Sequence, residues 1–502
     1  MRRATLKALY EVHSWVGLFL GLVLYVLLFS GSVSLFVKEL RPWEMGRPGV
    51  ALDVRAQALD TAVDNALMQA QGAGDFSVTP ASRFRPWIVV ELHAPDEGAH
   101  AVQYFDAATG ERVEVHQDNV TLVLTRLHTD LLLPSPWGRY LTGLLGVVML
   151  VSLLTGVFMH RKLFREMWSL RLWRSRRLRW ADLHKAAAIW GLPFHLMIAF
   201  TGAFLGLIGL VLMLNAFVAY DGDVDAATAA LGGGVTPVPG GAAPMRPLRE
   251  LLDASASALP GLQPEYISFS HYGDRAATLQ VWGALPQTLV YFPQVTLSVA
   301  SADVLAISNW REEYWVRALY GAMTPLHYAS YGGLLLKALY ALLGLAACFL
   351  VISGLRIWQL RVHPHSTDVR LPLIVGVCYG LPLAVATMLL ASRLLTGAAW
   401  TSYEARLGLL LAVWVAAIAC AVRFHWRSWA YCLATGIALM LVPLATIVGG
   451  STGLLDLLQS APPSSQVSSP VIAELVFNLL GVVIVLLSLA TRRFGTDTGR
   501  LL

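Results

Sequence analysis

The chain has 502 residues, of which 56% are hydrophobic and only 14% are charged, against about 25% charged residues in an average globular protein. This composition excludes a disordered chain and a water-soluble enzyme. The net charge of +5 does not indicate binding to nucleic acid, because the basic residues lie in short segments between apolar runs. The four cysteines lie inside apolar runs without a CxxC or CxxCH motif, which excludes disulfide scaffolds, zinc ribbons and c-type cytochromes.

Eight apolar stretches approach or exceed the length of about 20 residues that a membrane-spanning helix needs. We expect the first to be a retained helix, since it is long for a signal peptide and lacks a small-residue cleavage site. The stretches are Val16–Val37, Tyr140–Met159, Ala186–Leu214, Gly333–Leu355, Leu371–Ala391, Leu407–Val422, Ala430–Val448 and Val471–Ala490.

These stretches divide the chain into six segments. The predicted segments are helix 1 (1–37), a first outer module (38–138), helices 2 and 3 with a basic loop at 160–187 (139–214), a second outer module (215–332), helix 4 (333–360), and helices 5 to 8 with a tail (361–502).

The distribution of Lys and Arg predicts the orientation in the bilayer. The 160–187 connection contains nine basic residues, and three lie at each end of the chain, whereas 38–138 has eight basic against fourteen acidic residues and 214–332 has five against ten. Because positive charge stays on the cytoplasmic side, we expect both termini in the cytoplasm and both modules outside. A bacterial inner membrane facing a periplasm is the natural setting.

The first four spans repeat. A shift of 171 residues places His13 on His184 and Gly31 on Gly202. A Leu-His pair precedes span 2 and another precedes span 4, and aligning these pairs matches His128 with His327. Near the ends of the same spans, Gly156 in LLTGVF corresponds to Gly354 in VISGLR. Both halves begin on the same side, so the repeat is parallel. We therefore expect a mainly α membrane protein whose first four helices form two repeats, each with a small α+β module.

The two outer modules show the same order of elements. In the first, a helix at 56–70 precedes strands at 87–92 and 101–105 and a turn at FDAATGER. In the second, a flexible linker at 232–247 precedes a helix at 248–258 and strands. The strands expected there are 266–270, 277–281 and 295–299.

Histidines carry the chemical content of the sequence. A b-type haem needs two imidazoles that face each other from opposing helices, and equivalent residues of a repeat meet this demand. The sequence predicts His128 with His327 for an outer haem and His13 with His184 for an inner haem. Interfacial polar histidines are the plainer interpretation of each residue taken alone, but ionisable residues at membrane depth are usually functional.

A second pair of histidines is an alternative to His13 and His184 at the inner site. His195 follows His184 by eleven residues, which places both on one face of a helix and about 16 Å apart along its axis. His195 with His160 is thus a second candidate for the inner site, and a third haem is an alternative. No P-loop, no GxGxxG after a strand and no HExxH occur, so nucleotide and zinc-protease sites have no support.

The order of these motifs over residues 1 to about 360 resembles the PepSY-associated transmembrane family, of which bacterial ferrisiderophore reductases are members. The segments TGVFMHRKLFREMW and WADLHKAAAIWGLPFHLMIAFTG look like a longer branch with four extra helices. The resemblance implies a haem-bearing inner-membrane reductase of ferric chelates in the periplasm. It assigns ligand roles to His13, His128, His184 and His327, and less securely to His160 and His195.

Two other functions remain as alternatives. One is a binding or regulatory protein with PepSY-like modules, which haem content would distinguish from a reductase. The other is a transporter of iron chelates or metal ions, although the spans lack a midplane Asp or Glu. Spans 5 to 8 have no repeat partner, and we expect them to serve packing, homodimerisation or docking of a partner.

Overall fold

The architecture is taken from a computed structural model of the whole chain. It describes residues 3–46, 56–69, 74–93, 100–115, 118–159, 168, 170–171, 174–224, 226–227, 240–285, 288–289, 293–308, 315–362, 370–425, 427–448 and 469–497. These residues form two units, one of 1–46, 116–207 and 334–502 and one of 47–115 and 208–333.

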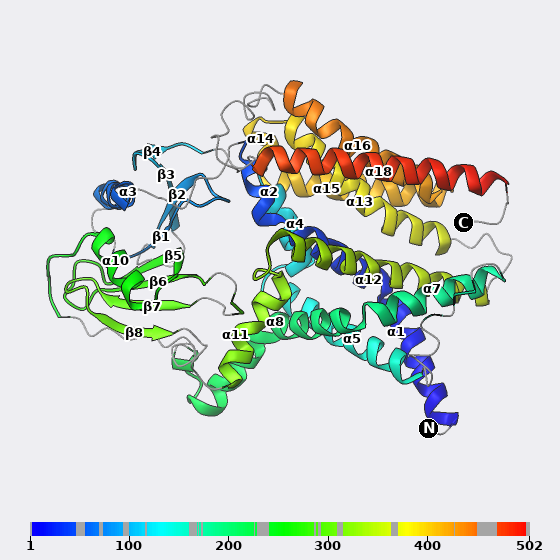
Figure 1. Cartoon of the computed structure of the whole chain (residues 1–502), viewed down its shortest axis with the longest axis horizontal. Helices are drawn as coiled ribbons and strands as arrows, with labels where there is room; N and C mark the ends of the chain where they lie inside the picture. Colours follow the sequence, from blue (N-terminus) through cyan, green and yellow to red (C-terminus); the bar gives the residue numbers. More distant parts are fainter. Residues whose placement is uncertain are drawn as a thin grey trace. The chain divides into compact units, whose positions relative to one another are not determined.

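Eight helices in the described part of the chain are long and apolar enough to cross a membrane, which confirms the predicted number (Figure 1). Long runs of Leu, Val, Ala and Gly form helices here because lipid offers no hydrogen-bond partner to the backbone. Their bounds are α1 Arg3–Ser34, α5 Trp137–Met159, α8 Leu192–Ala219, α12 Gly333–Val362, α13 Arg370–Leu394, α15 Tyr403–Phe424, α16 Ser428–Val448 and α18 Ser469–Asp497.

Several spans extend beyond their predicted bounds, and two of the differences concern the candidate histidines. Helix α1 begins at Arg3 instead of Val16, so His13 lies inside the helix. The third predicted stretch is interrupted at Gly191, which separates α7 (Arg176–Trp190) from α8. The physical reason is Pro193, which has no N–H to continue the helical hydrogen bonds.

Two short helices that were not predicted lie almost entirely in the segment 38–138, which was expected to form the first outer module, but they belong to the helical unit. They are α2 (Val37–Glu44) and α4 (Val120–Thr129), which contact each other. Helix α4 packs against α1 and buries Val123, Leu124 and Leu127. The helix that carries His128 is therefore an amphipathic segment packed against the first span.

Helices α13, α15, α16 and α18 pack together, and they also contact the first part of the chain. Helix α13 lies against α15 and α16, while α16 lies against α18. Helix α13 also contacts α1, where the Tyr25 hydroxyl donates to the Cys378 carbonyl, and α18 contacts α2. The packing role expected for spans 5 to 8 is thus observed, while dimerisation and partner docking stay predictions.

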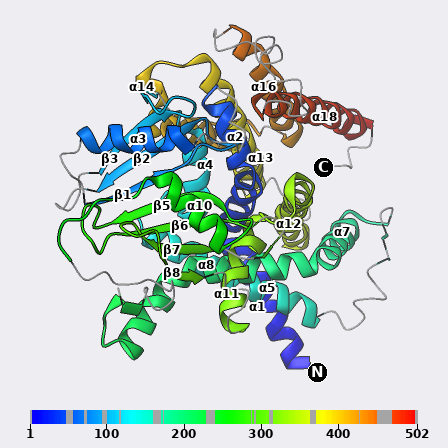
Figure 2. The same cartoon turned by 60° about the vertical axis from the view of Figure 1, so that its left-hand side comes forward.

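The second unit contains one antiparallel sheet of eight strands in the order β4-β3-β2-β1-β5-β6-β7-β8 (Figure 2). The sequence predicted two separate modules, but β1 pairs with β5 and joins them, with Phe76 opposite Phe269. The strands are β1 Asp75–Thr79, β2 Trp87–His93, β3 His100–Asp106, β4 Arg112–Val113, β5 Gln263–Ser270, β6 Thr278–Ala284, β7 Gln294–Ser298 and β8 Val304–Ser308.

Two helices, α3 (Ala56–Gln69) and α10 (Leu248–Ala258), contact each other and the sheet. Alternate strand residues such as Ile88 and Val90 are fully buried beneath them, as a period of two residues requires. Both helices match their predicted ranges. Strands β1 and β8 were not predicted.

Candidate functional site

The rings of His13 on α1 and His184 on α7 are neighbours. Their centroids are 6.4 Å apart, and the ring planes are nearly perpendicular at 85°. Imidazole nitrogen binds metal ions at about 2 Å, so two imidazoles on opposite sides of one iron have centroids about 6 Å apart. The spacing of this pair fits two axial ligands of one haem, and the structure thus brings together the two residues predicted for the inner site.

The Nδ1 atoms of both rings are held by hydrogen bonds. His13 Nδ1 donates to the Ser152 carbonyl at 2.9 Å. His184 Nδ1 lies 2.9 Å from Ser353 Oγ, whose own hydrogen is donated to the Phe349 carbonyl at 2.7 Å, so Ser353 Oγ accepts from His184. With the proton on Nδ1, the lone pair of each neutral ring is on Nε2, the tautomer that a metal ligand needs.

Glycines of the repeated [ST]G sequences lie against these rings. A Cβ atom on Gly156 would lie 3.5 Å from His13 Cε1, and one on Gly354 would lie 3.4 Å from His184 Cε1. Longer side chains at either glycine would meet the imidazole. The repeat aligns the two glycines, but their contact with the histidines was not predicted, although the repeated [ST]G sequence was a signal for it.

His128 on α4 is held in the same way from α1. Its Nδ1 donates to the Leu27 carbonyl at 3.0 Å, and a Cβ atom on Gly31 would lie only 2.7 Å from its Cε1. Burial lowers the pKa of His128, which keeps the imidazole neutral. His327 lies on α11 (Trp315–Tyr328) in the second unit. The pairing of His128 with His327 therefore stays a prediction.

His195 lies in a different environment from the other candidates. Its side chain is fully buried, its Nε2 donates to the Leu343 carbonyl at 3.1 Å, and its ring packs on Gly191. Because Nε2 donates to a carbonyl, the lone pair of the neutral ring lies on Nδ1, which is buried and has no hydrogen-bond partner among the described residues. The ligand role of His195 therefore stays a prediction. The rival inner pair also requires His160, which lies outside the described residues.

Among the residues that the structure describes, no three or more His, Cys, Asp or Glu side chains gather closely enough to hold a metal ion. A haem held by two histidines does not need such a cluster.

The segment that carries His184 is fixed by a buried carboxylate. Arg171 makes a bidentate contact with Asp182, with Nη2 at 2.9 Å and Nε at 3.0 Å, and Lys185 Nζ lies 3.5 Å from the same side chain. The hydrogen bond from Arg171 lowers the pKa of Asp182 to about 2. At least one arginine of the basic loop thus has an internal role in positioning α7.

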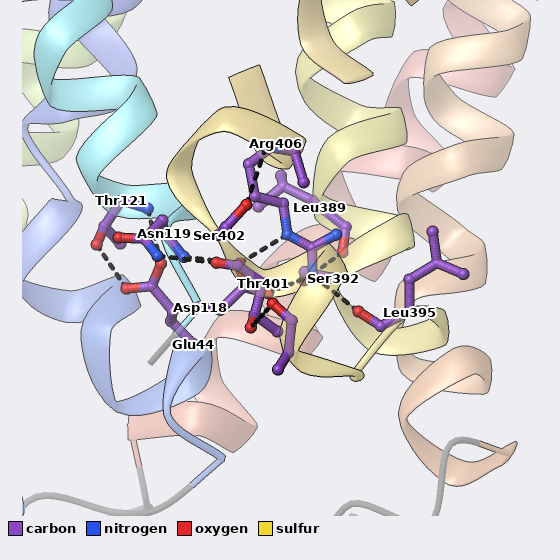
Figure 3. Close-up of polar contacts among 12 residues, drawn as sticks. Glu44, Asp118, Asn119, Thr121, Leu389, Ser392, Leu395, Thr401, Ser402 and Arg406 are labelled. Atoms are coloured by element: carbon purple, nitrogen blue, oxygen red, sulfur yellow. Dashed lines mark hydrogen bonds and ion pairs between the residues drawn. The ribbon is translucent and has the colours of Figure 1, made fainter. Parts of the chain in front are cut away.

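A second polar cluster lies where α2, α4 and α15 meet (Figure 3). Arg406 on α15 is almost fully buried and makes a bidentate contact with Asp118, both distances being 2.7 Å. Asn119 Nδ2 donates to the Thr401 carbonyl at 2.8 Å. Glu44, the last residue of α2, accepts the backbone N–H of Thr121 at 2.8 Å and its hydroxyl at 2.5 Å.

Four further buried residues extend this cluster toward α13, α16 and α18. The Arg393 guanidinium lies 3.8 Å from the centre of the Trp43 ring and donates to the Trp43 carbonyl. Glu474 accepts from the Thr446 hydroxyl at 2.6 Å. None of these residues was predicted from the sequence, because their contacts join segments that are far apart in the chain.

The raised pKa of the Glu44 carboxyl predicts that the stability of the fold depends on pH. Burial raises its pKa from 4.5 to about 7, so the folded protein binds this proton more tightly than the unfolded chain does. Stability should therefore fall as pH rises from about 4.5 to about 7, by up to about 3 kcal/mol from this group. Unfolding of wild type and Glu44→Gln in detergent at several pH values measures the difference, and equal slopes would contradict it.

Comparison with known proteins agrees with the motif order. The model of the PepSY-associated TM region matches residues 10–361. An uncharacterized protein of Pseudomonas aeruginosa is 36% identical over 291 residues, which cover 54% of this chain and 72% of that protein. The matched family region contains His13, His128, His184 and His327.

Proposed function

Because the chain belongs to the PepSY-associated transmembrane family, we propose that it is a haem-bearing reductase of the bacterial inner membrane. It carries electrons outward, with both termini cytoplasmic, and reduces ferric siderophores or other ferric chelates in the periplasm. The observation that supports this function most strongly is the spacing of the His13 and His184 rings, together with the hydrogen bonds that place the ring proton on Nδ1 and the lone pair on Nε2.

His13 and His184 would hold an inner haem b, and His128 with His327 an outer one. When bound, haem supplies one-electron chemistry, while the protein sets ligation, distance and dielectric. Hydrogen bonds to Nδ1 fix each ring and increase the basicity of Nε2. The glycines beside the rings let the helices approach the imidazoles closely.

Reduction suits the release of iron from a siderophore. Hard oxygen ligands prefer ferric iron, so one added electron weakens the complex without breaking the organic chelator. The sequence carries no nucleotide-binding motif, and we assign the electron donor to a separate cytoplasmic reductase or to membrane quinol. The ferric chelate is the substrate on the other side.

Proteoliposomes test this function. A reductant enclosed inside and a ferric chelate with a ferrous-specific dye outside should give ferrous iron outside with the wild type and only background with His128→Ala. His425→Asn is the control, since His425 ends α15 with a positive φ of 52°, a conformation that Asn tolerates. Wild-type reduction by a His128→Ala protein that has lost its outer haem would contradict the proposed route.

We expect Ser353 to affect how tightly the inner site holds haem. Ser353→Ala removes the hydroxyl that accepts from His184 Nδ1 at 2.9 Å, and loss of such a partner costs about 10–100-fold in metal affinity. We expect haem to dissociate about that much more readily, as measured by transfer to apomyoglobin. Thr155→Val should have a smaller effect, because Thr155 Oγ1 is 3.4 Å from His13 Nδ1 and the Ser152 carbonyl remains. Equal haem loss from wild type and Ser353→Ala would contradict this role.

A further inference from the structure

Glu44 caps a helix to which it does not belong. The first N–H groups of an α-helix have no partner within it, and Glu44 from α2 accepts the one on Thr121, the second residue of α4, together with the Thr121 hydroxyl. The residue at the usual capping position, Asn119, donates to Thr401 instead. The carboxylate therefore lies at the positive end of the α4 dipole.

The same helix carries His128. Seven residues separate Thr121 from His128, which is two turns along one face and about 10 Å along the axis. A unit charge about 10 Å away, at an effective dielectric constant of about 20, changes the proton affinity of a carboxyl by about tenfold. We therefore expect a change of charge at the His128 site to change the proton affinity of Glu44.

The charged groups around Glu44 come from several elements. Asp118 before α4 and Arg41 on α2 face it, and Arg393 on α13 faces it as well. Around Arg393 lie Glu474 on α18 and Arg406 on α15. Arg406 is neutralised by its bidentate contact with Asp118. Among the described residues, Glu44 is therefore the carboxyl at the N-terminal end of α4 that makes no bidentate contact with an arginine.

The cluster around Glu44 also contains two unsatisfied polar atoms. In the described residues, Arg393 Nε and Glu474 Oε2 are buried without a hydrogen-bond partner, on side chains that are 6% and 2% exposed. Buried polar atoms of this kind are commonly satisfied by internal water.

We propose that Glu44 is the proton-binding residue of the outer redox site and takes up one proton when one electron is added at the haem iron held by His128. This inference rests on the proposed function. The Glu44 carboxylate would form one O–H bond with a proton from water, and this proton would balance the one electron that the donor adds at the haem, so the net charge of the site would be unchanged. The proton returns to water when the electron passes to the ferric chelate. With a pKa of about 7, Glu44 is half-protonated near neutral pH and responds in both directions.

Redox titration of the purified holoprotein tests the inference. Between about pH 6 and about pH 8, the midpoint potential of the outer haem should fall as pH rises in wild type and should be independent of pH in Glu44→Gln. A residue with only a structural role would not produce this difference in pH dependence. The matched control is Glu404→Gln, an exposed carboxyl in the first turn of α15, which should behave like wild type.

A second variant covers the case in which Glu44→Gln does not fold. Thr121→Val removes the hydroxyl donor at 2.5 Å but keeps the carboxyl, so the pKa of Glu44 should rise and the pH-dependent range should move to higher pH. An unchanged pH dependence in Glu44→Gln, or in Thr121→Val where Glu44→Gln fails, would overturn the inference and leave the proposed function intact. A folded wild type without haem would remove both.

Discussion

Replacing His13 or His184 by alanine should remove one haem from each chain. It should also stop the reduction of ferric chelate by a reductant on the inner side of the membrane, where this pair is placed. The rings are 6.4 Å apart, and each is oriented by a hydrogen bond to Nδ1. Loss of either imidazole leaves the iron with one protein ligand, so the bis-histidine spectrum of that haem should disappear. A pyridine haemochrome assay gives the haem count per chain, and the proteoliposome assay gives the flux.

The outer haem should remain in these variants but should no longer be reducible from inside. His425→Asn serves again as the control for loss of a histidine. Wild-type haem content in both His13→Ala and His184→Ala would show that this pair does not hold haem. If His13 proved dispensable while His195 did not, the inner ligands would have to be reassigned although the direction of electron flow would stand.

Replacing Arg406 by methionine should destabilise the helical unit by about 3–5 kcal/mol, the usual effect of breaking a buried ion pair. The Arg406 side chain is 1% exposed and Asp118 is 7% exposed, so the remaining carboxylate would be buried without its counter-charge. The Leu395 carbonyl would also lose its donor at 3.0 Å. Denaturant unfolding in detergent measures the change.

The double variant Arg406→Met with Asp118→Leu separates the two causes of this loss. Removing both charges should restore most of the stability, since replacing a whole buried ion pair by apolar residues is often neutral. Glu404→Gln, which removes an exposed charge on the same helix, should change stability by less than about 0.5 kcal/mol. Equal stability of wild type and Arg406→Met would contradict the account of this cluster.

The helices were predictable where a local pattern defines them. Eight apolar runs gave eight spans, and the amphipathic patterns at 56–70 and 248–258 gave α3 and α10. The β1–β5 pair was not predictable, because it joins Phe76 to Phe269 across 193 residues and depends on two edges meeting in space. Helix α4 was not predicted, because a helix of ten residues that packs against α1 is too short for its hydrophobic periodicity to be recognised in the sequence.

The candidate site was only partly predictable. The repeat brought His13 and His184 into correspondence, and the structure places their rings together. The repeat also marked Gly31, Gly156 and Gly354, but only coordinates show that imidazoles lie against them. The contact of Asp118 with Arg406 spans 288 residues, and no local pattern in either segment indicates the other.

The optical spectrum of the purified full-length protein, oxidised and reduced, with a haem count per chain tests the central claim most directly. The proposed function predicts the spectrum of six-coordinate b-type haem with two histidine ligands and at least two haems per chain. A correctly folded protein from haem-sufficient cells that is colourless in both states would contradict it.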